Sequence, residues 1–471
     1  MPIFIFIDNV KHQNNFMKKL KVLSVSAVVV WASGYFLVSN FSGLPNVEPD
    51  KMPLAVLEQA GCVMCHSKEA TQPFYAHVPI AGQLIKTDME EGLKHFDITP
   101  TIEELKAGKI VNETALAKIE HSINDNSMPP LRFSIVHWTS SLNKAKKQVL
   151  LDWIASERKK LNANTGIAKK FENEPVWPVV APKNIDARKV KLGSILYHHT
   201  ALSGDETVSC ATCHPLDKGG ADGLQTSTGI RKQKGDINAP TVYNAVFNHR
   251  QFWDGRADNL QSQAGGPPLN PVEMDGGDWD KIAKRLEKDS AFAKEFKAVY
   301  PDGFTEKNIT DAIAEFESTL VTVDSDFDLF LKGDENAMSE NAKKGYKLFK
   351  DMGCAVCHSG RNLGGQTFEY MGLKADYFKE RGNVGKINDK GLVSFTKDER
   401  DTHKFKTPTL RNVSLTAPYF HDGSTSNLKE AVEIMAKFQR DKNLSDEEIA
   451  DIVKFLESLT GKLNGKKLEK K

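Results

Sequence analysis

CVMCH at residues 62–66, CATCH at 210–214 and CAVCH at 354–358 repeat one five-residue pattern three times. Together they use all six cysteines of the chain, so no thiol is left for a disulfide or for a separate cysteine nucleophile. C-x-x-C-H is the attachment pattern of c-type haem, in which two thiols bond the porphyrin and the histidine binds the iron. A single copy would also fit a redox pair or half of a zinc site. Three copies, each followed by histidine, predict three covalently bound haem c groups.

The three motifs also predict where each haem is held. Covalent attachment and proximal iron ligation are expected at Cys62, Cys65, Cys210, Cys213, Cys354 and Cys357, and at His66, His214 and His358. Apolar residues recur at helical spacing between the motifs, as in SDEEIADIVKFLESL at 445–459. The motifs lie roughly 150 residues apart, which is the usual length of one domain. The sequence therefore predicts a mainly α protein with three cytochrome c-like haem domains in tandem.

Composition and proline-containing linkers support separate globular domains. The chain is 40% hydrophobic and 27% charged, and its net charge of +1 gives no reason to expect nucleic-acid binding. The prolines of FENEPVWPVVAPKN at 171–184 cannot continue a helix and indicate a linker. We expect a monohaem cytochrome c domain at 45–165, a domain for the CATCH haem at 175–325 and a cytochrome c domain for the CAVCH haem at 326–471.

The N-terminal region carries an apolar stretch, VLSVSAVVVWASGYFLV at 22–38, without a charged residue. Its length is at the short end of a transmembrane helix. Lys18, Lys19 and Lys21 precede it and favour a cytoplasmic N-terminus at 1–21. A cleaved signal peptide is the alternative, although VSNFSG is a poor match to a cleavage site. We therefore predict a single-pass transmembrane anchor in a bacterial inner (cytoplasmic) membrane, with the haem domains in the periplasm.

Each iron also needs a second axial ligand, or an open face for reaction with a small molecule. Met128 precedes a helical pattern at 146–161, and Met435 precedes the pattern that ends the chain. A thioether ligand raises the haem potential and suits electron transfer. We expect Met128 on the first haem and Met435 on the CAVCH haem, although a methionine more commonly fills a gap in a core. Four histidines remain alternatives to Met128, namely His77, His95, His121 and His137.

The middle haem has no comparable methionine. Met274 is the nearest candidate, but its neighbour Glu273 is a carboxylate that could move protons at an open iron face. This arrangement predicts a catalytic CATCH haem and two haems that carry electrons.

Longer motifs extend this interpretation. They are NAPTVYNAVFN at 238–248, FWDGRADNLQSQAGGPPLNPVEM at 252–274 and TPTLRNVSLTAPYFHDGS at 407–424. Together with CATCH and CAVCH, these motifs make residues 175–460 resemble the bacterial dihaem cytochrome c peroxidases. The additional N-terminal haem region and the predicted anchor make the chain similar to the membrane-anchored trihaem quinol peroxidases.

The resemblance implies roles for residues at matching positions. The CATCH haem would be the peroxidatic one, with Glu273 as its distal acid–base residue and Gln263 as the polar partner of that carboxylate. Trp253 would lie between two haems and help electrons cross, although a packed core tryptophan fits the sequence equally well. The CAVCH haem would transfer electrons, with His358 and Met435 as its axial ligands.

The resemblance also implies one calcium ion between the domains. Asn238 and the backbone carbonyls of Thr416 and Pro418 match the positions of its protein ligands. Calcium prefers hard oxygen ligands, including carbonyls and waters, so this set is chemically reasonable.

One position departs from the pattern. Many dihaem relatives carry a histidine in a TS-x-G-H segment, which caps the peroxidatic iron until reduction releases it. In this chain the segment reads TSTGIRKQKG at 226–235, with Ile230 at that place. Isoleucine has no atom that binds iron, so we expect an open peroxidatic haem in the oxidised protein.

Several functions are compatible with these features. The first hypothesis is reduction of hydrogen peroxide to water, with electrons from a membrane quinol (ubiquinol or menaquinol) that pass through the haems. A second hypothesis takes electrons from a soluble cytochrome c instead. A third is a multihaem electron-transfer protein without catalysis, against which the Glu273–Gln263 pair argues. A fourth is an enzyme that oxidises a partner protein, and such relatives usually lack a methionine at the position of Met435.

Overall fold

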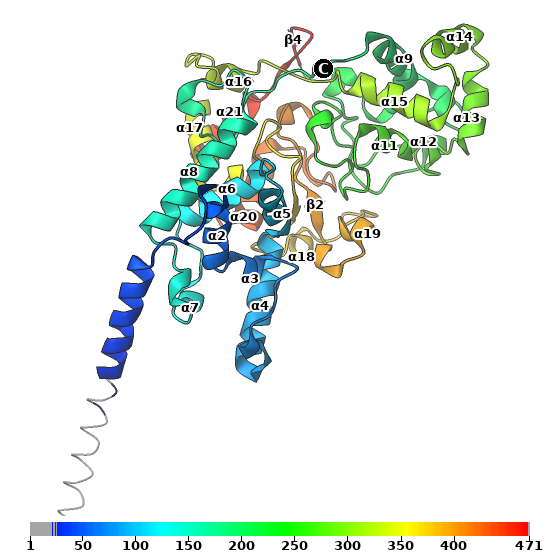
Figure 1. The fold of residues 1–471 in the computed structure, drawn as a ribbon. Coiled ribbons are helices and arrows are strands. Elements are labelled where there is room, and N and C mark those ends of the chain that lie inside the picture. Colours follow the sequence, from blue (N-terminus) through cyan, green and yellow to red (C-terminus); the bar gives the residue numbers. More distant parts are fainter. Residues whose placement is uncertain (1–20, 22–23, 25, 470–471) are drawn as a thin grey trace, which may run out of the picture. The chain divides into compact units, whose positions relative to one another are not determined.

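The protein is represented by a computed structural model that describes residues 21, 24 and 26–469, and helices dominate it (Figure 1). The chain forms two compact units. Unit 1 comprises Met1–Lys109 and Ile119–Ser156, and unit 2 comprises Ile110–Lys118 and Glu157–Lys471. The short segment 110–118 therefore leaves the first haem region and packs within unit 2.

Unit 1 contains the CVMCH motif. Its helices, two of which continue into unit 2, are α2 (Met52–Gln59), α3 (Cys62–His66), α4 (Pro79–His95), α5 (Thr99–Lys106), α6 (Glu113–Asn124), α7 (Leu131–Ser134) and α8 (Lys144–Leu161). Helices α3 and α4 approach closely, because a Cβ atom on Gly92 would lie only 2.5 Å from the Cys65 carbonyl oxygen. The motif is thereby held against the long helix α4.

Unit 2 contains the CATCH and CAVCH motifs, each beside its own apolar core. In the CATCH region the helices are α9 (Ala187–His198), α10 (Cys210–Cys213), α11 (Leu260–Ala264), α12 (Gly266–Leu269), α13 (Trp279–Leu286), α14 (Ser290–Val299) and α15 (Glu306–Glu317). In the CAVCH region they are α16 (Asp326–Leu331), α17 (Glu340–Asp351), α18 (Tyr377–Arg381), α19 (Val393–Thr396), α20 (Leu428–Arg440) and α21 (Asp446–Glu457). Leu196 and Phe296 lie in the first core, and Phe327 and Phe455 lie in the second.

Strands are short and confined to unit 2 in the described part of the chain. β1 (Phe368–Tyr370) pairs antiparallel with β2 (Lys404–Lys406), so that Glu369 lies opposite Phe405. β3 (Lys462–Leu463) pairs antiparallel with β4 (Lys466–Lys467). β1 follows the CAVCH motif in sequence and brings Glu369 into the region of that motif.

A close helix pair supports each motif of unit 2. Helices α9 and α15 pack so tightly that a Cβ atom on Gly193 would lie 1.9 Å from the Ala312 carbonyl oxygen. Helices α17 and α21 meet in the same way, and a Cβ atom on Gly345 would lie 1.9 Å from the Asp451 carbonyl oxygen. Only glycine permits backbones to approach this closely, so each helix crossing depends on its own glycine.

The prediction of three tandem cytochrome c-like domains is wrong, because the CATCH and CAVCH regions form one compact unit. Buried side-chain hydrogen bonds join them. Thr322 Oγ1 accepts a hydrogen bond from Asn244 Nδ2 at 2.8 Å and another from Asn412 Nδ2 at 3.0 Å. These bonds connect residues far apart in sequence, and the spacing of the haem motifs gives no sign of them.

The predicted transmembrane anchor at 22–38 is also wrong. Residues 22, 23 and 25 lie outside the described part, and the described helix covers 26–41. Among the residues that the structure describes, none of the helices combines the length and the apolar character needed to cross a bilayer. The predicted single-pass location in an inner membrane, with periplasmic haem domains, is therefore unsupported and is withdrawn.

Candidate functional site

The CATCH motif forms one helical turn that presents His214. Ser209 and Thr212 cap helix α10 reciprocally, which fixes the start of the turn. The Nδ1 atom of His214 hydrogen-bonds the Gly220 carbonyl at 3.3 Å, and the Tyr197 hydroxyl donates to the His214 carbonyl at 2.6 Å. Burial lowers the pKa of His214, which favours the neutral imidazole. A neutral ring held through Nδ1 is oriented to offer Nε2 to a metal.

The CAVCH motif is arranged in the same way. Its first turn is a 3-10 helix at Cys354–Val356, and the Nδ1 atom of His358 hydrogen-bonds the Leu363 carbonyl at 3.1 Å. Burial lowers the pKa of His358, and the ring lies beside Phe349 with the ring centres 6.3 Å apart. His358 is therefore oriented as an iron ligand by the same local device as His214.

In unit 1 the CVMCH motif is helix α3 itself. The Nδ1 atom of His66 lies 2.9 Å from the Gly92 carbonyl oxygen and 3.0 Å from that of Phe96. A hydrogen bond from Nδ1 to a backbone carbonyl is the usual support of a metal-binding histidine. All six cysteines are free thiols, as covalent haem attachment requires. The residues of all three motifs therefore fit haem c.

Glu273 lies on a turn that Asn270 organises. The Asn270 side chain donates from Nδ2 to Glu273 Oε1 at 2.7 Å and accepts from the Val272 amide at 2.9 Å. Burial raises the pKa of Glu273, while the positive charge of Arg256 and, less strongly, the hydrogen bond from Asn270 oppose that rise. Asn270 was missed by the sequence analysis, although an Asn-Pro pair three residues before a carboxylate is a recognisable turn signal.

Ile230 lies directly against this carboxylate turn. Its amide donates to the Glu273 carbonyl at 2.9 Å, and its side chain is fully buried in the apolar core of the CATCH region. The Arg231 guanidinium pairs with Asp275 at 2.6 Å, and the Gln233 side chain donates from Nε2 to the Pro271 carbonyl at 2.8 Å. The loop is therefore fastened to the segment that carries Glu273, with an apolar side chain at residue 230.

Gln263 is half-buried on helix α11. In the described part of the chain, the carboxylate of Glu273 bonds to Asn270 and not to Gln263. The structure thus brings Asn270 to Glu273, and Gln263 as its polar partner stays a prediction.

Trp253 lies where the CATCH and CAVCH regions meet. Its indole Nε1 donates to the Asn238 carbonyl at 2.9 Å, and its own carbonyl accepts from the Lys406 amide on β2 at 2.9 Å. The indole packs edge-on against Phe405 and His421, with ring centres 6.4 and 6.3 Å away. This position is compatible with both the packing role and the electron-transfer role considered above.

The predicted methionine ligands lie in different surroundings. Met435 is half-buried on α20 and packs against the apolar cluster that includes Trp253. Met128 is 36% exposed. Of its four histidine rivals, His137 has both ring nitrogens engaged, with the Tyr75 hydroxyl at 2.6 Å and the Phe133 carbonyl at 3.1 Å. His77 is exposed, His95 lies beside Glu91 on α4, and His121 lies beside Asp125 just after the end of α6.

The calcium site expected at Asn238, Thr416 and Pro418 stays a prediction, and the surroundings of Asn238 can be described. Asn238 is buried and its Nδ2 donates to the carbonyls of Leu224 and Gln225, so its Oδ1 is the remaining polar atom. Among the described residues, no donor reaches this Oδ1 or the carbonyl oxygens of Thr416 and Pro418. The Asn238 amide bonds to the His421 carbonyl at 2.7 Å, which brings Asn238 next to that loop. Neutral oxygens of this kind are suitable calcium ligands.

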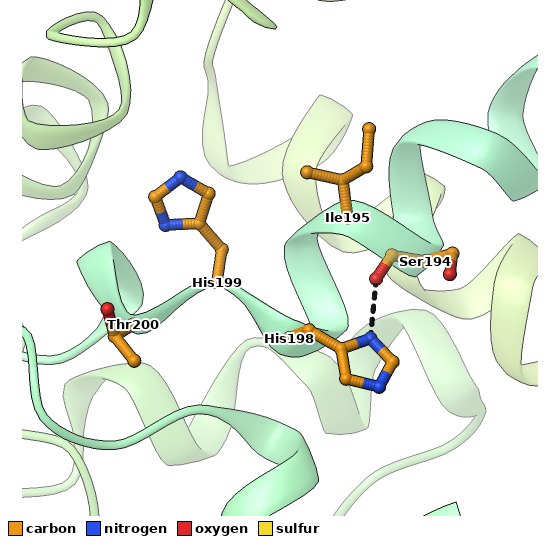
Figure 2. A pocket seen from close by; sticks show the side chains of 5 residues that line it. All are labelled: Ser194, Ile195, His198, His199 and Thr200. Carbon is orange, nitrogen blue, oxygen red and sulfur yellow. Dashed lines mark hydrogen bonds between the residues drawn. The ribbon is translucent and has the colours of Figure 1, made fainter.

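A pocket of about 490 Å³ lies beside α9 and is lined by Ser194, Ile195, His198, His199 and Thr200 (Figure 2). The Nδ1 atom of His198 bonds the Ser194 carbonyl at 2.9 Å, as Figure 2 shows. The Nδ1 atom of His199 accepts from the Ala201 amide at 3.1 Å. These histidines therefore stabilise the helix end, and none of the predicted haem or catalytic residues lines this pocket.

Comparisons with known families match three stretches of the chain. Residues 187–336 match the family described as "Di-haem cytochrome c peroxidase", residues 43–156 match "Haem-binding domain" and residues 342–460 match "Cytochrome c". Only the last of these is a cytochrome c domain, which corrects the expectation of three such domains.

Known relatives cover most of the chain. "Cytochrome c peroxidase Ccp" of Escherichia coli is 48% identical over 88% of this chain and 89% of its own length. "Cytochrome c551 peroxidase" of Pseudomonas aeruginosa is 46% identical over 59% of this chain and 80% of its own length. Among solved structures, a "MauG-like protein associated with microbial copper homeostasis" is 27% identical with a TM-score of 0.53, over 60% of this chain and 92% of that one.

Proposed function

This chain belongs to the dihaem cytochrome c peroxidase family and is a haem peroxidase, and we propose that it carries electrons from a quinol through three haem c groups to hydrogen peroxide. The observation that carries the assignment of the reacting site is the buried Glu273–Asn270 pair beside Ile230. It combines a proton carrier with a loop residue that cannot bind iron. The CAVCH haem and the first haem would then carry electrons.

Bound haem supplies the iron at which the oxygen–oxygen bond of peroxide is reduced. With haem bound, the Glu273 carboxylate would take a proton from peroxide and return it to the oxygen that leaves as water. Asn270 holds Oε1 of that carboxylate in place during both transfers. Because burial raises the pKa of Glu273, its proton affinity is closer to what both transfers need near neutral pH.

The contacts of Trp253 support a path for electrons between the two haems of unit 2. The indole bonds to Asn238 of the CATCH region, and the same residue bonds through its backbone to β2 of the CAVCH region. Met435 packs against the cluster that contains this indole. We place Met435 on the CAVCH iron and a calcium ion at Asn238, Thr416 and Pro418, where the ion would brace Trp253 through Asn238.

Quinol is the donor that we favour, because unit 1 exposes apolar side chains close to its haem motif. Phe133 packs on the motif, since a Cβ atom on Gly61 would lie 2.6 Å from its ring. The side chains of the neighbouring residues Leu131 and Val136 are 70% and 69% exposed. An apolar rim suits a quinol better than a docking cytochrome, which is steered mainly by charge. One quinol supplies the two electrons and two protons that convert one peroxide to two waters.

A soluble cytochrome c is the second candidate donor, and the name of the Escherichia coli relative, cytochrome c peroxidase, favours it. The test is steady-state reduction of hydrogen peroxide by the full-length protein, with a short-chain quinol or with reduced cytochrome c. We expect turnover with quinol that disappears in His66→Ala. Turnover with cytochrome c alone, unchanged in His66→Ala, would contradict entry at the first haem.

A further inference from the structure

Segment 110–118 belongs in sequence to the first haem region but packs in unit 2. The match to a haem-binding domain covers residues 43–156, so the segment lies within it. Nevertheless Ile110–Lys118 clusters with unit 2, whereas the residues before and after it belong to unit 1. Val111 is completely buried and Thr114 is 4% exposed. The segment is therefore an integral part of the larger unit.

The segment contacts the residues that follow the CAVCH motif. Thr114 Oγ1 lies 2.9 Å from the hydroxyl of Ser359, which is fully buried and directly follows His358. The Lys118 ammonium donates to Glu369 Oε1 on β1 at 2.6 Å, and both side chains are only 12% exposed. Contacts therefore run along the segment from Thr114 to Lys118.

The other side of the segment is fastened as firmly. Arg158 donates from Nε to Glu113 Oε1 at 2.9 Å, and both side chains are almost completely buried. The Val111 amide donates to Glu157 Oε2 at 3.0 Å. The segment is thus clamped between the end of α8 and the CAVCH region, and its position there is not a loose surface contact.

The Lys118–Glu369 pair also lies close to the CAVCH motif. Lys118 stands one helical turn after Thr114 on α6, and Thr114 contacts Ser359, the residue that follows His358. Both charges therefore lie near the segment that would hold the haem. A donor protein that approached this side of the motif would meet segment 110–118 in place of the haem.

We infer that segment 110–118 is a built-in docking element through which the first haem region delivers electrons to the CAVCH haem, with Lys118 and Glu369 as its positioning pair. This inference rests on the proposed entry of electrons at the first haem. In the step itself, one electron leaves the reduced first haem and reduces the oxidised CAVCH haem. No bond forms or breaks, and no proton has to move. The same contact excludes a soluble cytochrome from that side.

Charge reversal tests the positioning pair. Lys118→Glu places two carboxylates together, whereas Lys118→Glu combined with Glu369→Lys restores an ion pair with the opposite orientation. In stopped-flow mixing with quinol, the rate at which the CAVCH haem accepts electrons from the reduced first haem should fall at least tenfold in Lys118→Glu. The double variant and the conservative Lys118→Arg should recover most of that rate. Lys189→Glu is the matched control, because Lys189 forms a 2.6 Å ion pair with Asp311 on the α9–α15 pair.

Two further measurements separate positioning from loss of folding. Amide hydrogen exchange over 110–118 should increase in Lys118→Glu and return in the double variant, while haem content stays at the wild-type level. The midpoint potential of the CAVCH haem should shift in Lys118→Glu and not in Lys189→Glu. A wild-type transfer rate in Lys118→Glu, with raised exchange over 110–118, would overturn the docking role. If quinol fails to reduce the first haem in the wild-type protein, the proposed donor is wrong, and chemical reduction of that haem then tests the docking step alone.

Discussion

The CATCH and CAVCH regions begin alike and end in different chemistry. Each holds its motif beside a glycine-dependent helix pair, and each orients its histidine through Nδ1 and a backbone carbonyl. They differ in what approaches from elsewhere in the sequence. The CATCH region brings the buried carboxylate of Glu273 and the apolar side chain of Ile230. The CAVCH region instead contains helix α20, which carries Met435, and segment 110–118. We therefore expect haem attachment to be a local property, and we propose that reactivity depends on residues distant in sequence.

The largest effect should come from removing Glu273, the proposed proton carrier of the CATCH region. Glu273→Gln keeps the hydrogen bond to Asn270 possible but cannot take a proton. General acid–base catalysis typically contributes 10²–10⁴-fold, so we expect kcat to fall by about that factor. Steady-state peroxide reduction measures it, and haem spectra check that cofactor content is unchanged. Glu287→Gln, at an exposed position after α13, serves as control. Near-normal turnover in Glu273→Gln would remove this residue from the mechanism.

The two regions should also differ in spin state. With Ile230 unable to bind iron, the oxidised CATCH haem should be high-spin and should react with peroxide without prior reduction. The CAVCH haem should be low-spin, and Met435→Ala should make it high-spin and lower its potential, since axial ligands control a range of ~0.8 V. Electron paramagnetic resonance and stopped-flow mixing with peroxide provide the measurements. Low-spin signals from both haems of unit 2, with no reaction before reduction, would show that another residue caps the CATCH iron.

A smaller effect, on stability, tests whether the two helix pairs are equivalent. Gly193→Ala and Gly345→Ala each place a Cβ atom 1.9 Å from a carbonyl oxygen, so the helices must move apart. Overpacking of this kind costs ~1–3 kcal/mol, and we expect a lower Tm in calorimetry. Each variant should disturb the spectrum of its own haem more than that of the other. Gly43→Ala is the control, because open space surrounds that position. Equal spectral disturbance of both haems by either variant would show that the supports are not independent.

The smallest effect concerns the pH dependence of the CATCH site. Burial and the charge of Asp236 raise the pKa of Glu273, and the charge of Arg256 and the hydrogen bond from Asn270 lower it. Because the carboxylate must accept the first proton, kcat/KM should decrease as pH falls through this raised pKa. Asn270→Leu removes the opposing hydrogen bond and should move the acidic limb to higher pH. The residual activity of Glu273→Gln should lack this limb. An acidic limb at the same pH in Asn270→Leu would assign it to another group.

Local features of the site could be predicted from sequence, and non-local ones could not. The haem motifs are five-residue turns whose chemistry depends on their own side chains, so His66, His214 and His358 could be proposed as ligands from the sequence, and the structure orients each ring through Nδ1. Asn270 lies within three residues of Glu273 and could have been found from its turn signal. The pairing of Lys118 with Glu369 depends on a fold that brings distant segments together, and no local pattern marks it. The anchor was predicted wrongly because uncharged residues at 22–38 were taken as a span.

The ion pair between Lys118 and Glu369 can form only after both residues have been synthesised, which sets a delay during biosynthesis. Ribosomes add ~5–20 residues per second, so Glu369 is made roughly ten to fifty seconds after Lys118. During that interval the nascent chain carries Val111, Thr114 and Lys118 without the surfaces that later bury them. Once docking is complete, the segment packs against the very motif that must receive haem. We therefore expect maturation to be most efficient when Cys354 and Cys357 acquire their haem before the segment closes over them.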